Sequence, residues 1–286
     1  MRSKLFVPGS RPDLFEKALA GPADAVSFDL EDSVRPVDKE GARAAVVRLL
    51  DSDAARRARP MMLVRVNALD SPFGHDDLVA LARIGIAMIN LPKVSCRDDV
   101  RAAIAVLTKA EVGSSAEPAR LLVNIETPPA LRRASEIAAA DPRVAGLQLG
   151  LADLFEPFGI ARDDVANVRS VQLAVRLAAA EAGVWAVDAA YADVDDLAGF
   201  RDEALRARRC GYVGKSCIHP KQVGIANEVF SVDLAALAFA RRVVAADAAQ
   251  ATRGVGAFLL DGRMIDAPFI ARAKQLLDQA GRDGAV

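Results

Sequence analysis

Two short apolar stretches of the sequence each run into a carboxylate. Residues 121–125 lead directly into Glu126, and residues 147–152 lead into Asp153. If the first stretch is a β-strand, its two-residue alternation places Glu126 on the same face as Asn124, among residues that would be buried. An ionised carboxylate in such a place is costly unless it is paired or binds a metal. We therefore predict a divalent metal site at Glu126 and Asp153, with a helix N-cap or a structural salt bridge as the simpler alternative.

An arginine and three further acids are expected close to these two residues. The alternation of apolar and polar residues turns Asp29 and Glu31 inward, with Asp32 directly after them, and it turns Arg65 inward on another stretch. A guanidinium group there could bind a substrate carboxylate or stabilise an enolate oxygen, or it could be a structural partner of the acids. We expect at least one of the three acids to hold metal-bound water or Arg65, and we treat Glu31 and Asp32 as candidate catalytic residues.

Eight short apolar runs, most of them separated by amphipathic segments, supply the elements that would position these side chains. They are residues 4–8, 25–31, 61–67, 88–93, 121–126, 144–150, 184–190 and 212–218. Strands that alternate with helices favour a parallel sheet covered by helices, and a count of eight favours an α/β fold of the closed (β/α)8, or TIM barrel, type. An open dinucleotide-binding sheet is the rival, but no G-x-G-x-x-G motif follows the first run.

The ends of these runs matter because barrel enzymes carry their chemistry at the C-terminal ends of the strands. Nearly every expected strand ends on a polar or ionisable side chain. The residues at or near these ends include Glu31, Asn67, Lys93, Glu126, Asp153, Asp188 and His219. Packing alone does not explain this pattern, although His219 could equally be a satisfied strand-end histidine.

The barrel would occupy residues 1–230, and residues 231–286 exceed what it needs. They contain a long amphipathic segment at 234–252, a glycine-containing break at 253–256 and a last helix that spans about residues 268–280. We expect a small C-terminal helical extension that acts as a lid and packs on the barrel or on a neighbouring subunit.

The overall composition excludes several classes of function. Hydrophobic residues make up 52% of the 286-residue chain, which is enough for a sizeable core, and the formal net charge is −1 with both signs interspersed. This argues against a nucleic-acid or membrane-surface partner. The three cysteines show neither a disulfide framework nor zinc-ligand spacing. No signal peptide or membrane-spanning run is recognisable, so we expect a cytoplasmic protein.

Eight sequence motifs carry a more specific signal. In chain order they are LFVPG (5–9), DLED (29–32), VRVN (64–67), LPK (91–93), IET (125–127), GLADL (150–154), GKSCIHP (214–220) and GAF…DGRMID (256–266). In type and order they resemble those of the citrate lyase β-subunit-like enzymes, the CoA-ester lyase branch of the HpcH/HpaI aldolase superfamily. The resemblance runs from about residue 2 to residue 275.

This resemblance implies a Mg²⁺-dependent (β/α)8 barrel, trimeric or hexameric, that cleaves or forms a carbon–carbon bond of a 3-hydroxyacyl-CoA. It implies Glu126 and Asp153 as the protein ligands of Mg²⁺, with waters and substrate oxygens completing the octahedron. Arg65 would contact the oxo acid and the developing enolate oxygen. Asp266 would be the acid/base aspartate that reaches the active site of a neighbouring subunit.

The resemblance also covers part of the expected CoA site. The residues that match positions near the CoA arm are Phe6, Lys17, Ile218 and His219. The chain departs from the family pattern at Ala152, where many members have an acid, and at Asp13, where some members have a basic residue near the CoA phosphates. These departures leave the carrier and the acyl group open.

We therefore predict a lyase for a malyl-, citramalyl- or citryl-CoA-type thioester, with acetyl-CoA and oxaloacetate, glyoxylate or pyruvate as products. One alternative is a CoA-independent class II pyruvate aldolase, in which Asp266 and Lys17 would have no role. Another is a non-catalytic or carrier-dependent subunit of a lyase complex, and the combination of Arg65, Glu126, Asp153 and Asp266 argues against loss of catalysis. Hydrolysis of the acyl-CoA after condensation, to give a free acid such as malate, also remains open.

Overall fold

In the computed structural model of this chain, which describes residues 1–251 and 256–282, eight parallel strands close into a barrel. The strands are β1 (Ser3–Pro8), β2 (Ala25–Asp29), β3 (Met61–Arg65), β4 (Met88–Leu91), β5 (Arg120–Ile125), β6 (Val144–Leu149), β7 (Trp185–Asp188) and β8 (Gly214–Cys217). They follow one another around the barrel in chain order, and the pairing of β1 with β8 completes the ring. The predicted (β/α)8 barrel is confirmed.

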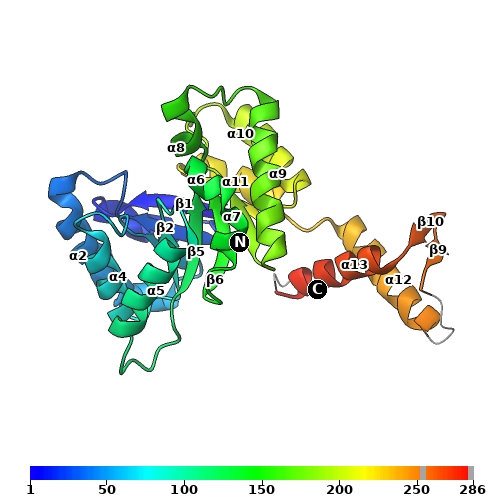
Figure 1. Cartoon of the computed structure of the whole chain (residues 1–286), viewed down its shortest axis with the longest axis horizontal. Coiled ribbons are helices and arrows are strands. Elements are labelled where there is room, and N and C mark those ends of the chain that lie inside the picture. Colours follow the sequence, from blue (N-terminus) through cyan, green and yellow to red (C-terminus); the bar gives the residue numbers. More distant parts are fainter. Residues whose placement is uncertain (252–255, 283–286) are drawn as a thin grey trace. The chain divides into compact units, whose positions relative to one another are not determined.

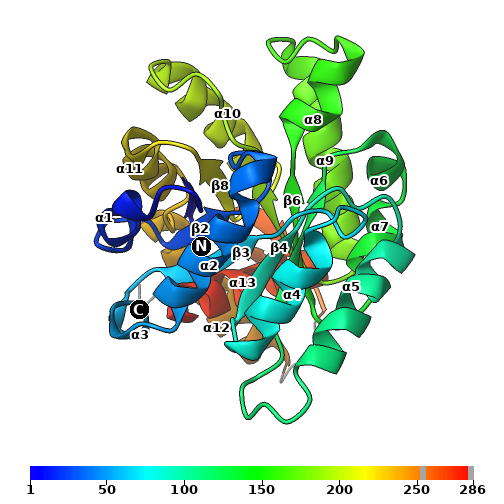
Figure 2. The ribbon, with the colours of Figure 1, turned by 90° about the vertical axis from the view of Figure 1, so that its left-hand side faces the viewer.

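Helices surround the strands, and every connection between successive strands contains at least one of them (Figures 1 and 2). The helices of this part of the chain are α1 (Phe15–Leu19), α2 (Lys39–Leu50), α3 (Asp53–Arg57), α4 (Gly74–Arg83), α5 (Arg97–Ala110), α6 (Pro128–Arg132), α7 (Ala134–Ala138), α8 (Leu151–Phe155), α9 (Val165–Glu181), α10 (Leu197–Arg209) and α11 (Pro220–Val229). Helix α5 shows how they are held, because its buried residues Val100, Ala103 and Leu107 recur at helical spacing and face the core.

The alternation along the strands separates an outer core from the barrel interior. Val26 and Phe28 of β2 belong to the core between sheet and helices, where the Phe28 ring packs edge-to-face on Phe15 at a centroid distance of 4.9 Å. Ser27 and Asp29, which alternate with them, therefore face the interior. A separate apolar cluster fills part of that interior and consists of Ala25, Leu63, Met88, Leu122 and Ala145.

The chain divides into two compact units, Met1–Phe230 and Ser231–Val286. The second unit contains α12 (Leu234–Ala251), an antiparallel hairpin of β9 (Phe258–Leu260) and β10 (Arg263–Ile265), and α13 (Ala267–Arg282). The sequence interpretation included the helices but not the hairpin. Its turn is Asp261-Gly262, both with positive φ, which is the backbone that a two-residue hairpin turn requires. The predicted break at 253–256 lies almost wholly outside the described residues.

One stretch of the described chain, Pro220–Gln250, is long and apolar enough to cross a membrane by length and composition alone. This is weak evidence, because core helices of soluble proteins pass the same test. The stretch comprises α11 and most of α12, which belong to different units, and α11 buries Val223, Ala226 and Val229 in the barrel core.

Candidate active site

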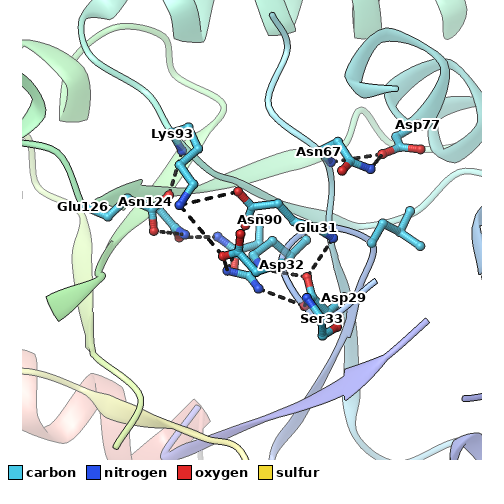
Figure 3. Close-up of polar contacts among 12 residues, drawn as sticks. Asp29, Glu31, Asp32, Ser33, Asn67, Asp77, Asn90, Lys93, Asn124 and Glu126 are labelled. Carbon is cyan, nitrogen blue, oxygen red and sulfur yellow. Dashed lines mark hydrogen bonds and ion pairs between the residues drawn. The ribbon is translucent and has the colours of Figure 1, made fainter. Parts of the chain in front are cut away.

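The C-terminal ends of β2 to β6 bring together most of the residues singled out in the sequence. Arg65 is the last residue of β3, and Glu126 follows β5 directly. Glu31 and Asp32 follow β2, and Asp153 lies in the first turn of α8, just after β6. Ion pairs link side chains from these separate strands across the mouth of the barrel. Figure 3 shows those of Lys93 with Glu31 and Asp32.

Arg65 is held by a bidentate pair with Asp29. Its Nε and Nη2 donate to the two carboxylate oxygens of Asp29 at 2.7 and 2.8 Å, which is the fork geometry that a guanidinium prefers. Its Nη1 lies 2.9 Å from Oε2 of Glu31 and 3.2 Å from Oδ2 of Asp32. Burial raises the pKa of Asp29, but the hydrogen bond and charge of Arg65, together with hydrogen bonds from Ser33 and the Glu31 backbone, outweigh burial and leave that pKa lowered. The ring of Phe6 covers the guanidinium, with 5.0 Å from its centroid to Cζ.

Glu126 is almost fully buried, with 2% of its surface exposed. Its Oε1 accepts a hydrogen bond from the backbone N–H of Lys93 at 2.7 Å, and its Oε2 accepts one from Asn124 Nδ2 at 2.9 Å. Burial raises the pKa of this carboxyl, and the charge of Lys93 opposes the rise. A side chain at Gly150 would place its Cβ 2.7 Å from Oε2, so only glycine allows this approach. The protein thus holds a buried carboxylate in one fixed orientation.

A chain of hydrogen bonds runs beneath Glu126 through the barrel interior. Nζ of Lys4 donates to Asn90 Oδ1 at 2.7 Å, Asn90 Nδ2 donates to Asn124 Oδ1 at 2.6 Å, and Asn124 donates to Glu126. Burial first, and then the charge of Arg65, hold the pKa of Lys4 well below its usual value. The inward alternation identified Asn124, but neither Lys4 nor Asn90 was assigned a role from the sequence.

Lys93 is the site residue that the sequence interpretation left without a role. It stands directly after Pro92 at the end of β4, and its Nζ lies 2.6 Å from Oδ1 of Asp153. The same ammonium group is 3.7 Å from Oε1 of Glu31 and 3.8 Å from Oδ2 of Asp32. Figure 3 shows its side chain extending toward these two acids. The strand-end position was a signal that could have identified it.

Glu31 has the most unusual protonation in the cluster. Burial, above all, raises its pKa to about 8; Arg65 opposes the rise, while the charges of Glu126 and Asp32 add to it. A carboxyl group that holds a proton near neutral pH is suited to acid/base chemistry. Glu31 therefore differs from Asp29, which shares the same arginine but keeps its charge.

Of the four residues matched to the CoA arm, Phe6 contacts Arg65 in the cluster, and the other three lie elsewhere around the barrel. Lys17 is exposed on α1, and Ile218, with 40% exposure, follows β8. His219 is half-buried, and its Nδ1 accepts a hydrogen bond from the backbone N–H of Lys221 at 3.2 Å, which caps α11. His219 thus has a structural role in this geometry.

Two further acids, besides those of the cluster at the mouth, were singled out in the sequence. Asp188 was expected among the strand-end side chains there, and that expectation is wrong: it alternates with the inward side chain of Val187 and faces outward. Its carboxylate pairs with Nζ of Lys215 at 2.6 Å. Asp266 directly precedes α13 in the second unit, and its Oδ1 is buried without a hydrogen-bond partner among the described residues.

The chemistry of the cluster fits a hard divalent cation. No group of three or more His, Cys, Asp or Glu residues is arranged as a complete metal cage in the described part of the chain. Mg²⁺, however, commonly uses only one or two carboxylates and keeps several waters. Glu126 and Asp153 supply such carboxylates, and Lys93 bridges them, with its backbone N–H on Glu126 and its ammonium on Asp153. Glu126 and Asp153 therefore stay the predicted ligands of the ion.

Comparison with known proteins adds an independent line of evidence. A model of the HpcH/HpaI aldolase/citrate lyase family matches residues 2–220. The chain is 37% identical over 301 residues to the L-malyl-CoA/beta-methylmalyl-CoA lyase of Rhodobacter capsulatus, with 98% of this chain and 94% of that protein covered. It is 36% identical over 286 residues to the citrate lyase subunit beta of Escherichia coli K12, with 99% and 94% covered.

A solved structure supports the same family assignment. The chain is similar to protein CitE from Mycobacterium tuberculosis in complex with magnesium, acetoacetate and coenzyme A, with a TM-score of 0.75 and 33% identity. The similarity covers 98% of this chain and 100% of that one.

Proposed function

Because the chain belongs to the HpcH/HpaI aldolase/citrate lyase family, we propose that it is a Mg²⁺-dependent carbon–carbon lyase that cleaves or forms a 3-hydroxyacyl-CoA thioester. The observation that carries this proposal is the convergence of Glu126, Asp153 and Arg65 at the mouth of one barrel. Relatives that match nearly the whole chain are a lyase of malyl-CoA and beta-methylmalyl-CoA and a citrate lyase subunit.

The relatives support a proposal for the class of substrate. The solved CitE structures include complexes with coenzyme A and acetoacetate, with oxaloacetate and with pyruvate, in each case with magnesium. We infer a CoA thioester on one side of the reaction and a short 2-oxo acid on the other, of the oxaloacetate, glyoxylate or pyruvate type. In the cleavage direction the 3-hydroxyl loses its proton, the C2–C3 bond breaks, and its electrons pass to the thioester as the enolate of acetyl-CoA.

Arg65 is the residue placed to offset the negative charge that develops in this step. Asp29 fixes the guanidinium by two hydrogen bonds, which orients Nη1, the nitrogen that pairs with Glu31 and Asp32, before an oxyanion forms beside it. A bound Mg²⁺ would supply Lewis-acid polarisation of the substrate oxygens, with Glu126 and Asp153 holding it. Glu126 is oriented for this by Lys93 and Asn124 before any ligand arrives.

Glu31 is the barrel residue best suited to exchange the hydroxyl proton. Its pKa of about 8 lets it take up and release a proton near neutral pH. Its Oε2 lies 2.9 Å from Nη1 of Arg65, so a substrate oxygen that binds this edge of Arg65 would also lie close to Glu31. Asp32, on the same edge of Arg65, is the more exposed partner in this pair.

Asp266 would supply the second proton-transfer group from a neighbouring subunit, in a homotrimer or hexamer. An unpartnered carboxylate oxygen in the second unit is available for such a role. The test mixes two inactive variants, Arg65→Ala and Asp266→Ala, after reversible dissociation of the oligomer. Activity should return in the mixture, because some sites then combine an intact barrel with an intact Asp266. Light scattering gives the oligomeric state, and no recovery in a confirmed mixed oligomer contradicts a role in trans.

The decisive assay measures release of acetyl-CoA or propionyl-CoA from malyl-, beta-methylmalyl-, citramalyl- and citryl-CoA, with and without EDTA. We expect release from at least one thioester and its loss with EDTA. Cleavage of a free hydroxy-keto acid instead would identify a CoA-independent aldolase.

A second candidate function follows from one of the relatives. The citrate lyase subunit beta is by its name part of a larger assembly, and this chain is 36% identical to it. Activity on a carrier-bound thioester, with none on the free CoA thioesters, would favour such a subunit. A cytoplasmic location is part of the proposal in either case.

A further inference from the structure

Lys93 contacts the acidic cluster through both its backbone and its side chain. Its backbone is left-handed, with φ of 53°, which is unfavourable for a residue with a side chain. In this conformation its N–H points at Oε1 of Glu126, 2.7 Å away, while its Nζ lies 2.6 Å from Oδ1 of Asp153. The strained backbone thus places one residue between the two carboxylates that the proposed function assigns to the metal.

The ammonium group of Lys93 is the cation that the cluster holds at this position. Besides Asp153, it faces Glu31 at 3.7 Å and Asp32 at 3.8 Å. Arg65, the other cation of the described cluster, is committed to Asp29 by its bidentate pair. Any divalent ion between Glu126 and Asp153 would therefore meet the positive charge of Lys93 at close range.

We propose that the Lys93 ammonium acts as a built-in counter-cation, which occupies the acidic cluster until a divalent ion displaces it from Asp153. This inference rests on the metal site of the proposed function and adds a role for a residue that the site did not need as a ligand. Lys93 lowers the affinity for the ion, since each bound metal must replace an ion pair of 2.6 Å. It also offsets part of the negative charge of the acids around it while no ion is bound.

The side chain of Lys93 is able to move away from Asp153. It is 29% exposed and carries its charge on a flexible four-carbon stem, so the ammonium can move into water. By contrast Lys215, the lysine that pairs with Asp188 and Glu203, is fully enclosed with 0% exposure and contacts these two carboxylates at once. The ammonium group of Lys215 therefore cannot move into water, whereas that of Lys93 lies at the open mouth of the barrel.

The test is calorimetric titration of Mg²⁺ into the metal-free full-length protein and two variants. Lys93→Met removes the charge but keeps the length of the side chain. It also keeps the Cβ at this left-handed position and the backbone N–H bond to Glu126. We expect Mg²⁺ to bind Lys93→Met tighter by about tenfold or more, because the like charge is gone. Lys109→Met, on the exposed face of α5, is the matched control and should bind as the wild type does.

Thermal unfolding supplies a readout independent of affinity. Without metal, Lys93→Met should melt below the wild type, because its acids lose their counter-cation, and Mg²⁺ should raise its melting temperature more than that of the wild type. If Lys93→Met does not fold, Lys93→Gln, which keeps a hydrogen-bond donor for Asp153, serves the same purpose.

The outcomes separate this inference from the proposed function. Equal or weaker binding by the folded Lys93 variant would overturn the role of Lys93 and leave the metal site standing. No saturable Mg²⁺ binding to the wild type, at any concentration that a Mg²⁺ enzyme requires, would instead overturn the metal site itself, and the inference with it.

Discussion

Two groups of charged residues in the barrel unit differ in one informative respect. On the outer side of β7 and β8, Nζ of Lys215 lies 2.6 Å from Asp188 and 2.5 Å from Glu203, and Arg162 adds a second bond to Glu203 at 2.7 Å. Gln172 donates to the free oxygen of Asp188 at 3.0 Å. Two cations face two anions, so this closed network is balanced within the described residues.

The cluster at the barrel mouth is not balanced. Its described acids, at positions 29, 31, 32, 126 and 153, outnumber the two cations Arg65 and Lys93 that pair with them. Burial raises the pKa of Glu31 and Glu126, and the charges of neighbouring acids add to the rise in both. Buried charge by itself therefore does not mark a functional site. A buried excess of one sign, at the open end of the barrel, does mark one, because it creates a demand for a ligand of the opposite sign.

The largest expected effect comes from a change in the unbalanced cluster. Glu126→Ala or Asp153→Ala should lower kcat by about a thousandfold or more, because the metal contributes several kcal/mol of transition-state stabilisation. Circular dichroism should show an intact fold. Loss of folding instead would mean that these acids are as structural as those of the closed network.

The converse change addresses the closed network. Lys215→Met leaves Asp188 and Glu203 without their shared cation and should lower the free energy of unfolding by about 3–5 kcal/mol, measured by denaturant titration. Activity per folded molecule should stay close to that of the wild type. Lys221→Met, which removes an exposed pair with Asp195, is the control and should change stability little. A large loss of activity in folded Lys215→Met would give the outer network a functional role.

A smaller effect is expected from the support beneath Glu126. Asn124→Ala removes the donor to Oε2 and interrupts the chain from Lys4, so Mg²⁺ affinity should fall by about 10- to 100-fold. Asn67→Ala is the matched control, since Asn67 is another buried asparagine but donates to Asp77 instead. Equal affinities in the two variants would show that the chain does not orient Glu126.

The last expected effect is a pH dependence of stability. Glu31 keeps its proton up to a pKa of about 8 in the folded protein but loses it near 4.5 when unfolded. Between these values the folded state binds more protons, so stability should fall as pH rises, by up to about 1.4 kcal/mol per pH unit from this group. Glu31→Gln should flatten the slope in metal-free protein. An unchanged slope would mean that Glu31 titrates normally.

The sequence predicted the barrel and part of its site for an identifiable reason. Strand alternation and strand ends are local patterns, and they were enough to place Glu126 and Arg65 at one mouth and to turn Asp29 inward. The same strand-end rule misplaced Asp188, because only alternation within β7 shows that it faces outward, toward Gln172 of α9. A prediction from strand ends must also consider which face of the sheet each side chain occupies.

The rest of the site depends on closure of the ring. The contacts of Lys4 with Asn90, and of Lys93 with Asp153, join strands and loops whose registers no local pattern fixes. The left-handed backbone of Lys93 could not be predicted from the sequence either, because lysine is not a residue that favours this conformation. Asp266 was found by resemblance to a family rather than by any pattern in its own segment.

The central claim is that the unbalanced cluster binds a divalent ion through Glu126 and Asp153. The most direct test is a crystal structure of the protein with Mn²⁺, located by its anomalous scattering. We predict one Mn²⁺ site per chain, bonded to oxygens of both carboxylates, with the Lys93 ammonium moved away from Asp153. A metal bound elsewhere, or a mouth that keeps the Lys93–Asp153 pair in saturating Mn²⁺, would contradict the account.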